Sequence, residues 1–297
     1  MRIRVNGRWL FFEVDGFKAA GGAGERGERP TVVALHGGPG IDHADLRSAL
    51  SPLSKYAQVL YLDHLGNGRS ERASPEHWNL ERWGDDVRAF CEALDVTRPI
   101  IFGNSFGGMV ALAYATRYPT HPGKLILCAT TARFERGAAL ETFARLGGKD
   151  AALVAERFFT DPGGAAFDDY VRVCLPLYRR HPAMPGGHSS IVNLDVARHF
   201  VRGEWNTFDF RAQLSAIACP TLVLAGDDDP VFPIICSEAL ASGIRPGLVR
   251  FERFVDCGHT VINDAHEQAH AVIEAFVLQE LESTPNDSHV RRSATCG

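Results

Sequence analysis

The chain has 297 residues, of which 45% are hydrophobic and 23% are charged, and its formal net charge at pH 7 is −5. This composition is typical of a globular protein, and the length suits one large α/β domain with an insertion or two domains. The negative net charge argues against a broad nucleic-acid-binding surface. The sequence has no run of about 18 apolar residues, so we expect no membrane-spanning helix.

In chain order, the first expected element is a strand or hairpin over residues 1–13, with Asn6-Gly7 as its turn. From Thr31 onwards, short β-branched runs alternate with longer segments that have apolar residues at helical spacing. The predicted strands are Thr31–His36, Gln58–His64, Pro99–Ser105, Lys124–Thr130, Pro220–Gly226 and Val249–Val255, and the predicted helices are Leu80–Leu94, Phe106–Tyr118 and Asp264–Leu281. This alternation predicts an α/β fold with a mostly parallel, doubly wound sheet.

The alternation stops between Ala132 and Phe208, where the chain has a helical pattern interrupted by proline and glycine. We therefore expect a core domain formed by residues 1–131 and 209–282. A helical cap, inserted after the sixth strand, would comprise residues 132–208. The polar residues 283–297 lack periodicity and predict a flexible C-terminal tail.

The strongest motif is Gly103-Asn104-Ser105-Phe106-Gly107, which has the pattern G-x-S-x-G. It directly follows an apolar strand and directly precedes a helical segment, which is the setting of a nucleophile elbow. Glycines on both sides leave room for the tight turn that presents the serine. We predict Ser105 as a catalytic nucleophile.

A second motif, His36-Gly37-Gly38-Pro39-Gly40, follows the strand at Thr31. A glycine loop at this place can turn a backbone N–H towards the elbow. We expect the oxyanion hole to consist of the amides of Gly38 and Phe106, the latter directly after the nucleophile. His36 is expected to brace the loop by hydrogen bonding rather than to act as a base.

The acid and the base are expected later in the chain, each in a loop that follows a strand. Three carboxylates, Asp227, Asp228 and Asp229, follow the strand that ends at Gly226. His259 lies between the last strand and the last helix, where a neutral imidazole can accept the serine proton. The residues alone leave the choice among the three acids open.

Together with Asp63-His64-Leu65-Gly66-Asn67-Gly68-Arg69-Ser70, these motifs resemble the proline iminopeptidase family of α/β-hydrolases from about Thr31 to Leu281. The resemblance implies a catalytic triad of Ser105, Asp229 and His259, because the family's acid stands three residues after the glycine. It also implies a helical cap. The Asp63 loop is expected to brace the site entrance without a catalytic role.

The family's aminopeptidases hold the substrate ammonium with glutamates, one in the cap and often one directly after the triad aspartate. Here Pro230 follows Asp229, so the second acid is missing. Glu204 or Asp195 would then serve as the clamp. If Arg198 or Arg202 faced the pocket instead, a neutral or anionic acyl group would be the better substrate.

The expected function is a serine hydrolase that cleaves a small peptide, amide or ester bond through an acyl-enzyme, with release of an N-terminal residue as the leading activity. An esterase or lactonase is the first alternative, and a lyase or cyclase on the same scaffold is the second. No metal-binding or nucleotide-binding motif is present, so no cofactor is expected. The expected partner is a small molecule or short peptide in the cytoplasm, and the oligomeric state is left open.

Overall fold

The computed structural model describes residues 1–16, 29–182 and 190–279. The tail expected at residues 283–297 lies outside these ranges. The described residues form one eight-stranded sheet in the order β1-β2-β4-β3-β5-β6-β7-β8. Its strands are β1 (Arg2–Val5), β2 (Arg8–Asp15), β3 (Thr31–Leu35), β4 (Gln58–Leu62), β5 (Ile100–Asn104), β6 (Lys124–Cys128), β7 (Thr221–Gly226) and β8 (Val249–Phe254).

The sheet is mixed only at one edge. Strands β1 and β2 form a hairpin through Asn6 and Gly7, both at positive φ, and β2 pairs antiparallel with β4. All remaining pairs, from β4 to β8, are parallel. This arrangement confirms the predicted α/β fold with a mostly parallel sheet.

Alternate residues of the central strands pack into two separate apolar layers. Val33, Leu35 and Ile101 face the layer that contains α2 (Leu80–Ala93) and α3 (Phe106–Arg117). Val32, Ala34 and Ile100 face the opposite layer, which contains α1 (Ala44–Leu50) and α9 (His266–Leu278). Strands buried on both faces consist almost entirely of apolar residues, as the sequence shows here.

Short elements complete the core domain. They are α7 (Ile234–Gly243), α8 (Val261–Asp264) and the 3₁₀ turns η1 (Ser51–Lys55), η2 (Pro75–His77) and η5 (Arg211–Ala216). Among the helices in the described part of the chain, none has both the length and the apolar character needed to cross a bilayer.

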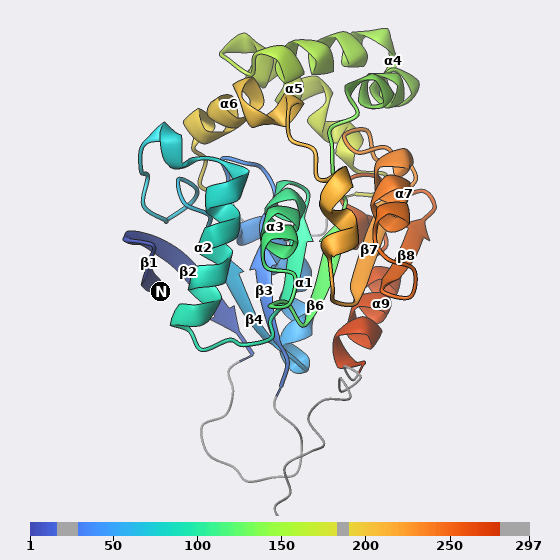
Figure 1. The fold of residues 1–297 in the computed structure, drawn as a ribbon. Coiled ribbons are helices and arrows are strands. Elements are labelled where there is room, and N and C mark those ends of the chain that lie inside the picture. Colours follow the sequence, from blue (N-terminus) through green and yellow to red (C-terminus); the bar gives the residue numbers. More distant parts are fainter. Residues whose placement is uncertain (17–28, 183–189, 280–297) are drawn as a thin grey trace, which may run out of the picture.

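The regular elements that the structure describes between β6 and β7 are helices, joined by loops. These include α4 (Arg136–Thr160), α5 (Ala165–Val173), η3 (Leu175–Tyr178), α6 (Leu194–Arg202) and η4 (Glu204–Asn206). A single β-bridge pairs Arg133 with Asp209, where the chain leaves and re-enters the core. Figure 1 shows α4, α5 and α6 grouped beyond one end of the sheet. We refer to residues 132–208 as the cap segment.

Candidate active site

Ser105 occupies a sharp turn between β5 and α3. Its backbone has φ 53° and ψ −119°, a conformation that residues other than glycine rarely adopt. A Cβ on Gly103 would lie 2.6 Å from the carbonyl oxygen of Gly107, and a Cβ on Gly107 would overlap the carbonyl of Leu35. The two glycines of the motif therefore permit a turn that any larger residue would block.

The turn is fixed by hydrogen bonds from the neighbouring strand. The Ser105 amide donates to the carbonyl of Cys128 at 2.9 Å, and the Thr130 hydroxyl donates to the Ser105 carbonyl at 2.7 Å. The serine is consequently presented at one end of the sheet by contacts that hold its main chain rather than its side chain.

Three side chains from separate loops meet at this turn. His259 Nε2 lies 2.9 Å from Ser105 Oγ, and His259 Nδ1 lies 2.8 Å from Asp229 Oδ2. The other carboxylate oxygen of Asp229 accepts the backbone N–H groups of Val231 and Phe232 at 2.8 and 2.9 Å. Because an aspartate oxygen accepts the Nδ1 proton, Nε2 is left free to accept the serine proton.

The structure shows which of the three consecutive aspartates, 227 to 229, contacts the catalytic histidine. Asp227 forms an ion pair with Arg253, and Asp228 forms ion pairs with Arg145 and Arg180. Asp229 is 1% exposed and is the one of the three that contacts His259.

The two expected oxyanion donors lie beside the serine. Phe106 is the first residue of α3, where a backbone N–H has no acceptor within the helix. Gly38, at φ 113°, lines the same cavity as Ser105. Neither amide donates a hydrogen bond to another residue in the described ranges, and their role as oxyanion donors stays a prediction.

His36 braces the glycine loop. The backbone N–H of His64 donates to His36 Nε2 at 3.2 Å, so the proton of this ring lies on Nδ1, which donates to the Gly37 carbonyl at 2.7 Å. Burial lowers the pKa of His36, which favours the neutral form that both bonds require. His36 has therefore no free nitrogen with which to act as a base.

The loop is also held from both sides at Gly40. Its amide donates to Asn67 Oδ1 at 2.6 Å, and its carbonyl accepts the backbone N–H of Asn193, in the cap segment, at 2.7 Å. A Cβ on Gly40 would lie 2.7 Å from the Asn193 carbonyl oxygen. The cap segment thus rests directly on the loop that carries the expected oxyanion donor.

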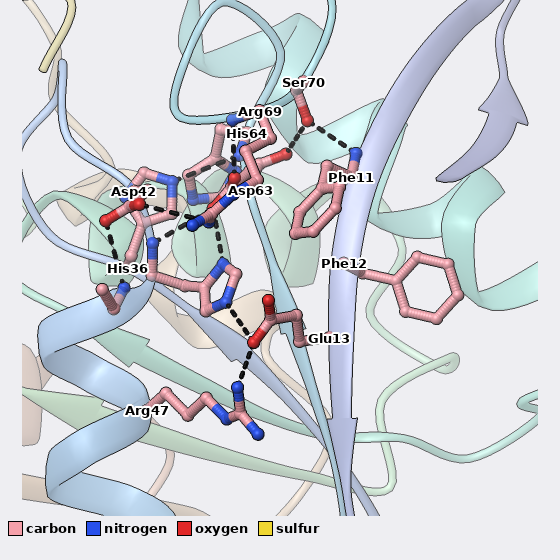
Figure 2. A network of polar contacts seen from close by, with 12 residues as sticks. Phe11, Phe12, Glu13, His36, Asp42, Arg47, Asp63, His64, Arg69 and Ser70 are labelled. Carbon is pink, nitrogen blue, oxygen red and sulfur yellow. Dashed lines mark hydrogen bonds and ion pairs between the residues drawn. The ribbon is translucent and has the colours of Figure 1, made fainter. Parts of the chain in front are cut away.

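A buried polar network holds the end of this loop (Figure 2). His43 is 1% exposed and donates through Nδ1 to Asp63 at 2.6 Å, while its Nε2 faces Glu13 at 3.4 Å. Asp63 also accepts the backbone N–H groups of His43 and Arg69, at 3.1 and 2.8 Å. Arg47 pairs with Glu13 in turn. The Asp63 loop therefore anchors the oxyanion loop at its far end.

Ser105 and His259 open into a cavity of about 630 Å³ between the core domain and the cap segment. Its cap wall is mainly aromatic and aliphatic and includes Phe158, Phe159, Phe167, Tyr170, Val171, Leu175, Tyr178, Val201 and Trp205. Asp42 and Asp45 belong to its core wall. Arg179 is the one lysine or arginine among the described residues that line it, and it forms no ion pair within the described ranges.

The three expected cap residues do not line this cavity. Glu204 accepts the backbone N–H of Leu80 at 2.8 Å, at the start of α2, and burial raises its pKa. Asp195 and Arg198 lie on the outer face of α6, 3.5 Å apart, in a separate surface groove. The structure therefore does not bring Glu204 or Asp195, the residues expected to clamp an ammonium group, to the wall of the cavity that contains Ser105.

Several residues around the site were not predicted from the sequence. Asn193 and His43 hold the oxyanion loop, and Tyr178 and Arg179 line the cavity. No motif marks them, because each acts through a contact between segments far apart in the chain. Within the described residues, no cluster of three or more histidine, cysteine or acidic side chains is arranged to hold a metal.

The comparison with known proteins agrees with this geometry. Residues 30–265 match the family described as alpha/beta hydrolase fold. The chain belongs to this family. It is 26% identical to the proline iminopeptidase PfmaB of Pestalotiopsis fici, over 95% of this chain and 97% of that protein. It is 30% identical to the 2-hydroxymuconate semialdehyde hydrolase of Pseudomonas sp. (strain CF600), over 77% and 80% of the two chains.

A solved structure supports the fold of this hydrolase. The proline iminopeptidase of Mycobacterium smegmatis superposes with a TM-score of 0.71 at 22% identity, over 93% of this chain and 97% of that one. At this identity the likeness concerns the fold alone. The relatives differ in the substrates that their names give, so they establish a hydrolase without fixing its substrate.

Proposed function

We propose that this hydrolase cleaves an ester or lactone through an acyl-enzyme on Ser105, and that the acyl group of its substrate is apolar or negatively charged. The observation that carries the proposal is the continuous chain of hydrogen bonds from Asp229 through His259 to Ser105, at the floor of a mainly apolar cavity.

In the first half of the reaction, Ser105 Oγ attacks the substrate carbonyl carbon while its proton passes to His259 Nε2. The carbonyl oxygen becomes an oxyanion that accepts hydrogen bonds from the Gly38 and Phe106 amides. His259 then returns the proton to the leaving alcohol as the acyl-enzyme forms. A water molecule repeats these steps to release the acid, and Asp229 stabilises the imidazolium each time without taking up its proton.

The cavity walls favour a neutral or anionic acyl group over an ammonium group. Moving an ammonium from water into an apolar cavity costs several kcal/mol unless a carboxylate pairs with it. The two carboxylates expected for this task face elsewhere. Arg179 lines the cavity without an ion-pair partner in the described ranges, and its charge attracts an anion and repels a cation. Of the two carboxylates that also line the cavity, Asp42 is paired with Arg69, whereas Asp45 is exposed.

Release of an N-terminal residue is the second candidate, and Asp45 is the observation that favours it. Asp45 is an exposed carboxylate that lines the cavity and forms no ion pair within the described ranges. Similarity to a proline iminopeptidase over nearly the full length of both chains adds weight to this candidate.

The test compares wild type and Ser105→Ala on p-nitrophenyl butyrate, monomethyl succinate and proline p-nitroanilide. Wild type should release up to one equivalent of p-nitrophenol in a burst before steady state, because acylation by this activated ester is faster than deacylation and the acyl-enzyme accumulates. Loss of a nucleophile typically removes about 10⁶-fold in kcat, so Ser105→Ala should have no measurable turnover. More than a few per cent residual activity would contradict the role of Ser105. Faster cleavage of the anilide than of both esters would favour the second candidate.

A further inference from the structure

Two tyrosines form a polar spot in the otherwise apolar cap wall of the cavity. Tyr170, from α5, and Tyr178, from η3, both line the cavity, and their hydroxyl oxygens lie 2.7 Å apart. Tyr170 is 4% exposed, and the ring of Phe158 stacks on it at 4.0 Å between centroids. Two phenylalanines would fill this space without burying a polar group, so packing alone does not account for the pair.

Counting hydrogens identifies what the pair can do. Each phenol carries one hydroxyl hydrogen, and the bond between the two hydroxyls uses one of them. The second hydrogen has no acceptor among the described residues. A buried hydroxyl hydrogen without an acceptor is costly, and both tyrosines line a cavity that a substrate would fill.

We propose that the Tyr170–Tyr178 pair donates its spare hydrogen to an oxygen of the substrate other than the oxygens of the scissile ester. The substrate is therefore an ester or lactone with a further acceptor oxygen, which belongs to a ketone or a carboxylate group. This inference rests on the proposed function and names the substrate class of the same site.

The pair lies close to the reacting atoms. The Tyr178 ring packs edge-on against the His259 ring, with 4.8 Å between the ring centroids. The Tyr178 carbonyl also accepts, at 3.2 Å, the backbone N–H of Thr260, which directly follows His259. A Cβ on Gly258 would overlap the same carbonyl, which shows how closely the two segments approach. An oxygen held by the tyrosines would consequently lie in the part of the cavity next to the catalytic histidine.

The environment keeps the pair a donor rather than a base. Burial raises the pKa of Tyr170 well above its usual value, and burial also raises the pKa of Tyr178. Both phenols thus keep their hydrogens throughout the pH range of an activity assay. A hydrogen bond surrounded by aromatic rings is also stronger than the same bond in water.

The experiment measures kcat/KM for Tyr170→Phe, Tyr178→Phe and the double variant, with acid release followed in a pH-stat. The three substrates are methyl isocaproate, methyl levulinate and monomethyl succinate. They differ only at the fourth carbon of the acyl chain, which is a branched alkyl carbon in the isocaproate, a ketone in the levulinate and a carboxylate in the succinate. The levulinate and succinate arms distinguish a neutral acceptor from an anionic one.

The expected pattern follows from the single spare hydrogen. In either single variant, the remaining phenol turns its own hydrogen to the substrate, so kcat/KM should fall less than about twofold. The double variant has no donor left and should lose about three- to tenfold on methyl levulinate, or ten- to hundredfold on monomethyl succinate, mainly through KM. Its loss on methyl isocaproate should stay below about twofold.

A purely structural tie between α5 and η3 gives the opposite pattern. Each single variant would then break the tie completely, the double variant would be no worse, and all three esters would suffer alike. That result would overturn the proposal, as would a wild-type enzyme that shows no preference for an ester with a further oxygen.

Tyr118→Phe is the matched control, because its hydroxyl donates to Asp85 at 2.8 Å at the C-terminal end of α3, the end opposite Ser105. It should leave all three rates unchanged. Failure of the proposed function would appear separately, as turnover by Ser105→Ala.

Discussion

Replacing Asp63 with asparagine tests whether the network behind the oxyanion loop depends on charge. In the wild type, Asp63 Oδ1 accepts the Nδ1–H and the backbone N–H of His43, and Oδ2 accepts the backbone N–H of Arg69. Asparagine keeps the volume but has one acceptor oxygen. Its NH₂ group would therefore point at one set of these donors.

The pKa shifts give the pH range in which this substitution costs most. Burial opposes the charged forms, but hydrogen bonds between the partners overcome it, so the pKa of His43 is raised and the pKa of Asp63 is lowered. The contribution of Asp63 to stability is present above its unfolded pKa and is lost as pH falls through the folded value. The contribution of His43 is present below its unfolded pKa and is lost as pH rises through the folded value. Both are therefore present together between about pH 4 and pH 6.5.

Breaking a buried pair by removing one charge costs about 3–5 kcal/mol. Asp63→Asn should lose about this much unfolding free energy at about pH 6 and clearly less at about pH 9, which is well above the usual pKa of a histidine. Native proteins have about 5–15 kcal/mol in total, so the variant should still fold. Urea unfolding followed by circular dichroism measures the loss. The control Asp161→Asn removes an exposed partner of Arg202 and should leave the unfolding free energy nearly unchanged. A loss below about 1 kcal/mol for Asp63→Asn at pH 6, or an equal loss at both pH values, would refute the charged network.

Two further predictions concern the elbow and the charges of the cap segment. Gly103→Ala should reduce kcat by at least about tenfold, because its Cβ would press on the main chain of Gly107 near Ser105. The control Gly137→Ala has open space around it and should keep the wild-type kcat. Equal kcat values for the two variants would show that the turn can relax. Arg179→Gln should lower kcat/KM for monomethyl succinate about three- to tenfold and leave kcat/KM for p-nitrophenyl butyrate unchanged. Glu204→Gln and Arg198→Gln should not change kcat/KM for either ester or for proline p-nitroanilide. A loss confined to the anilide in Glu204→Gln would instead support Glu204 as the ammonium clamp.

The core of the fold could be predicted from local patterns because each strand carries its own signal. The run that precedes Ser105 is apolar, and the glycines around it allow one kind of turn, so strand, turn and helix follow from neighbouring residues. The seven-residue helix α1 was not predicted, because two turns contain too few apolar positions to define a helical period. The order of the strands follows from pairing across the sheet and required the structure.

The cap residues show where the sequence argument was incomplete. The buried positions of α6 are Val196, Ala197, Phe200 and Val201, an apolar stripe at helical spacing. This stripe already places Asp195 and Arg198 on the opposite face, so the signal was present in the sequence. Glu204 is different: its partner is the amide of Leu80, 124 residues earlier, and no local pattern reveals such a contact. Tyr170 and Tyr178 likewise meet only because α5 and η3 fold back on each other.

The bonds at Gly40 bear on how substrate ranges can be exchanged within this family. An engineered chimera that transplants a foreign cap would replace the cavity wall. It would also remove Asn193, which hydrogen-bonds to Gly40, and Ala197, whose Cβ would lie 3.2 Å from a Cβ placed on Gly40. Such a graft would need a residue with a free backbone N–H at the matching position, an asparagine there to keep the side-chain bond to the Gly66 carbonyl, and a small side chain one helical turn later. Libraries that vary only the cavity-lining residues of α4 and α5 preserve the contact between the cap segment and Gly40. They are therefore the better starting point for changing specificity.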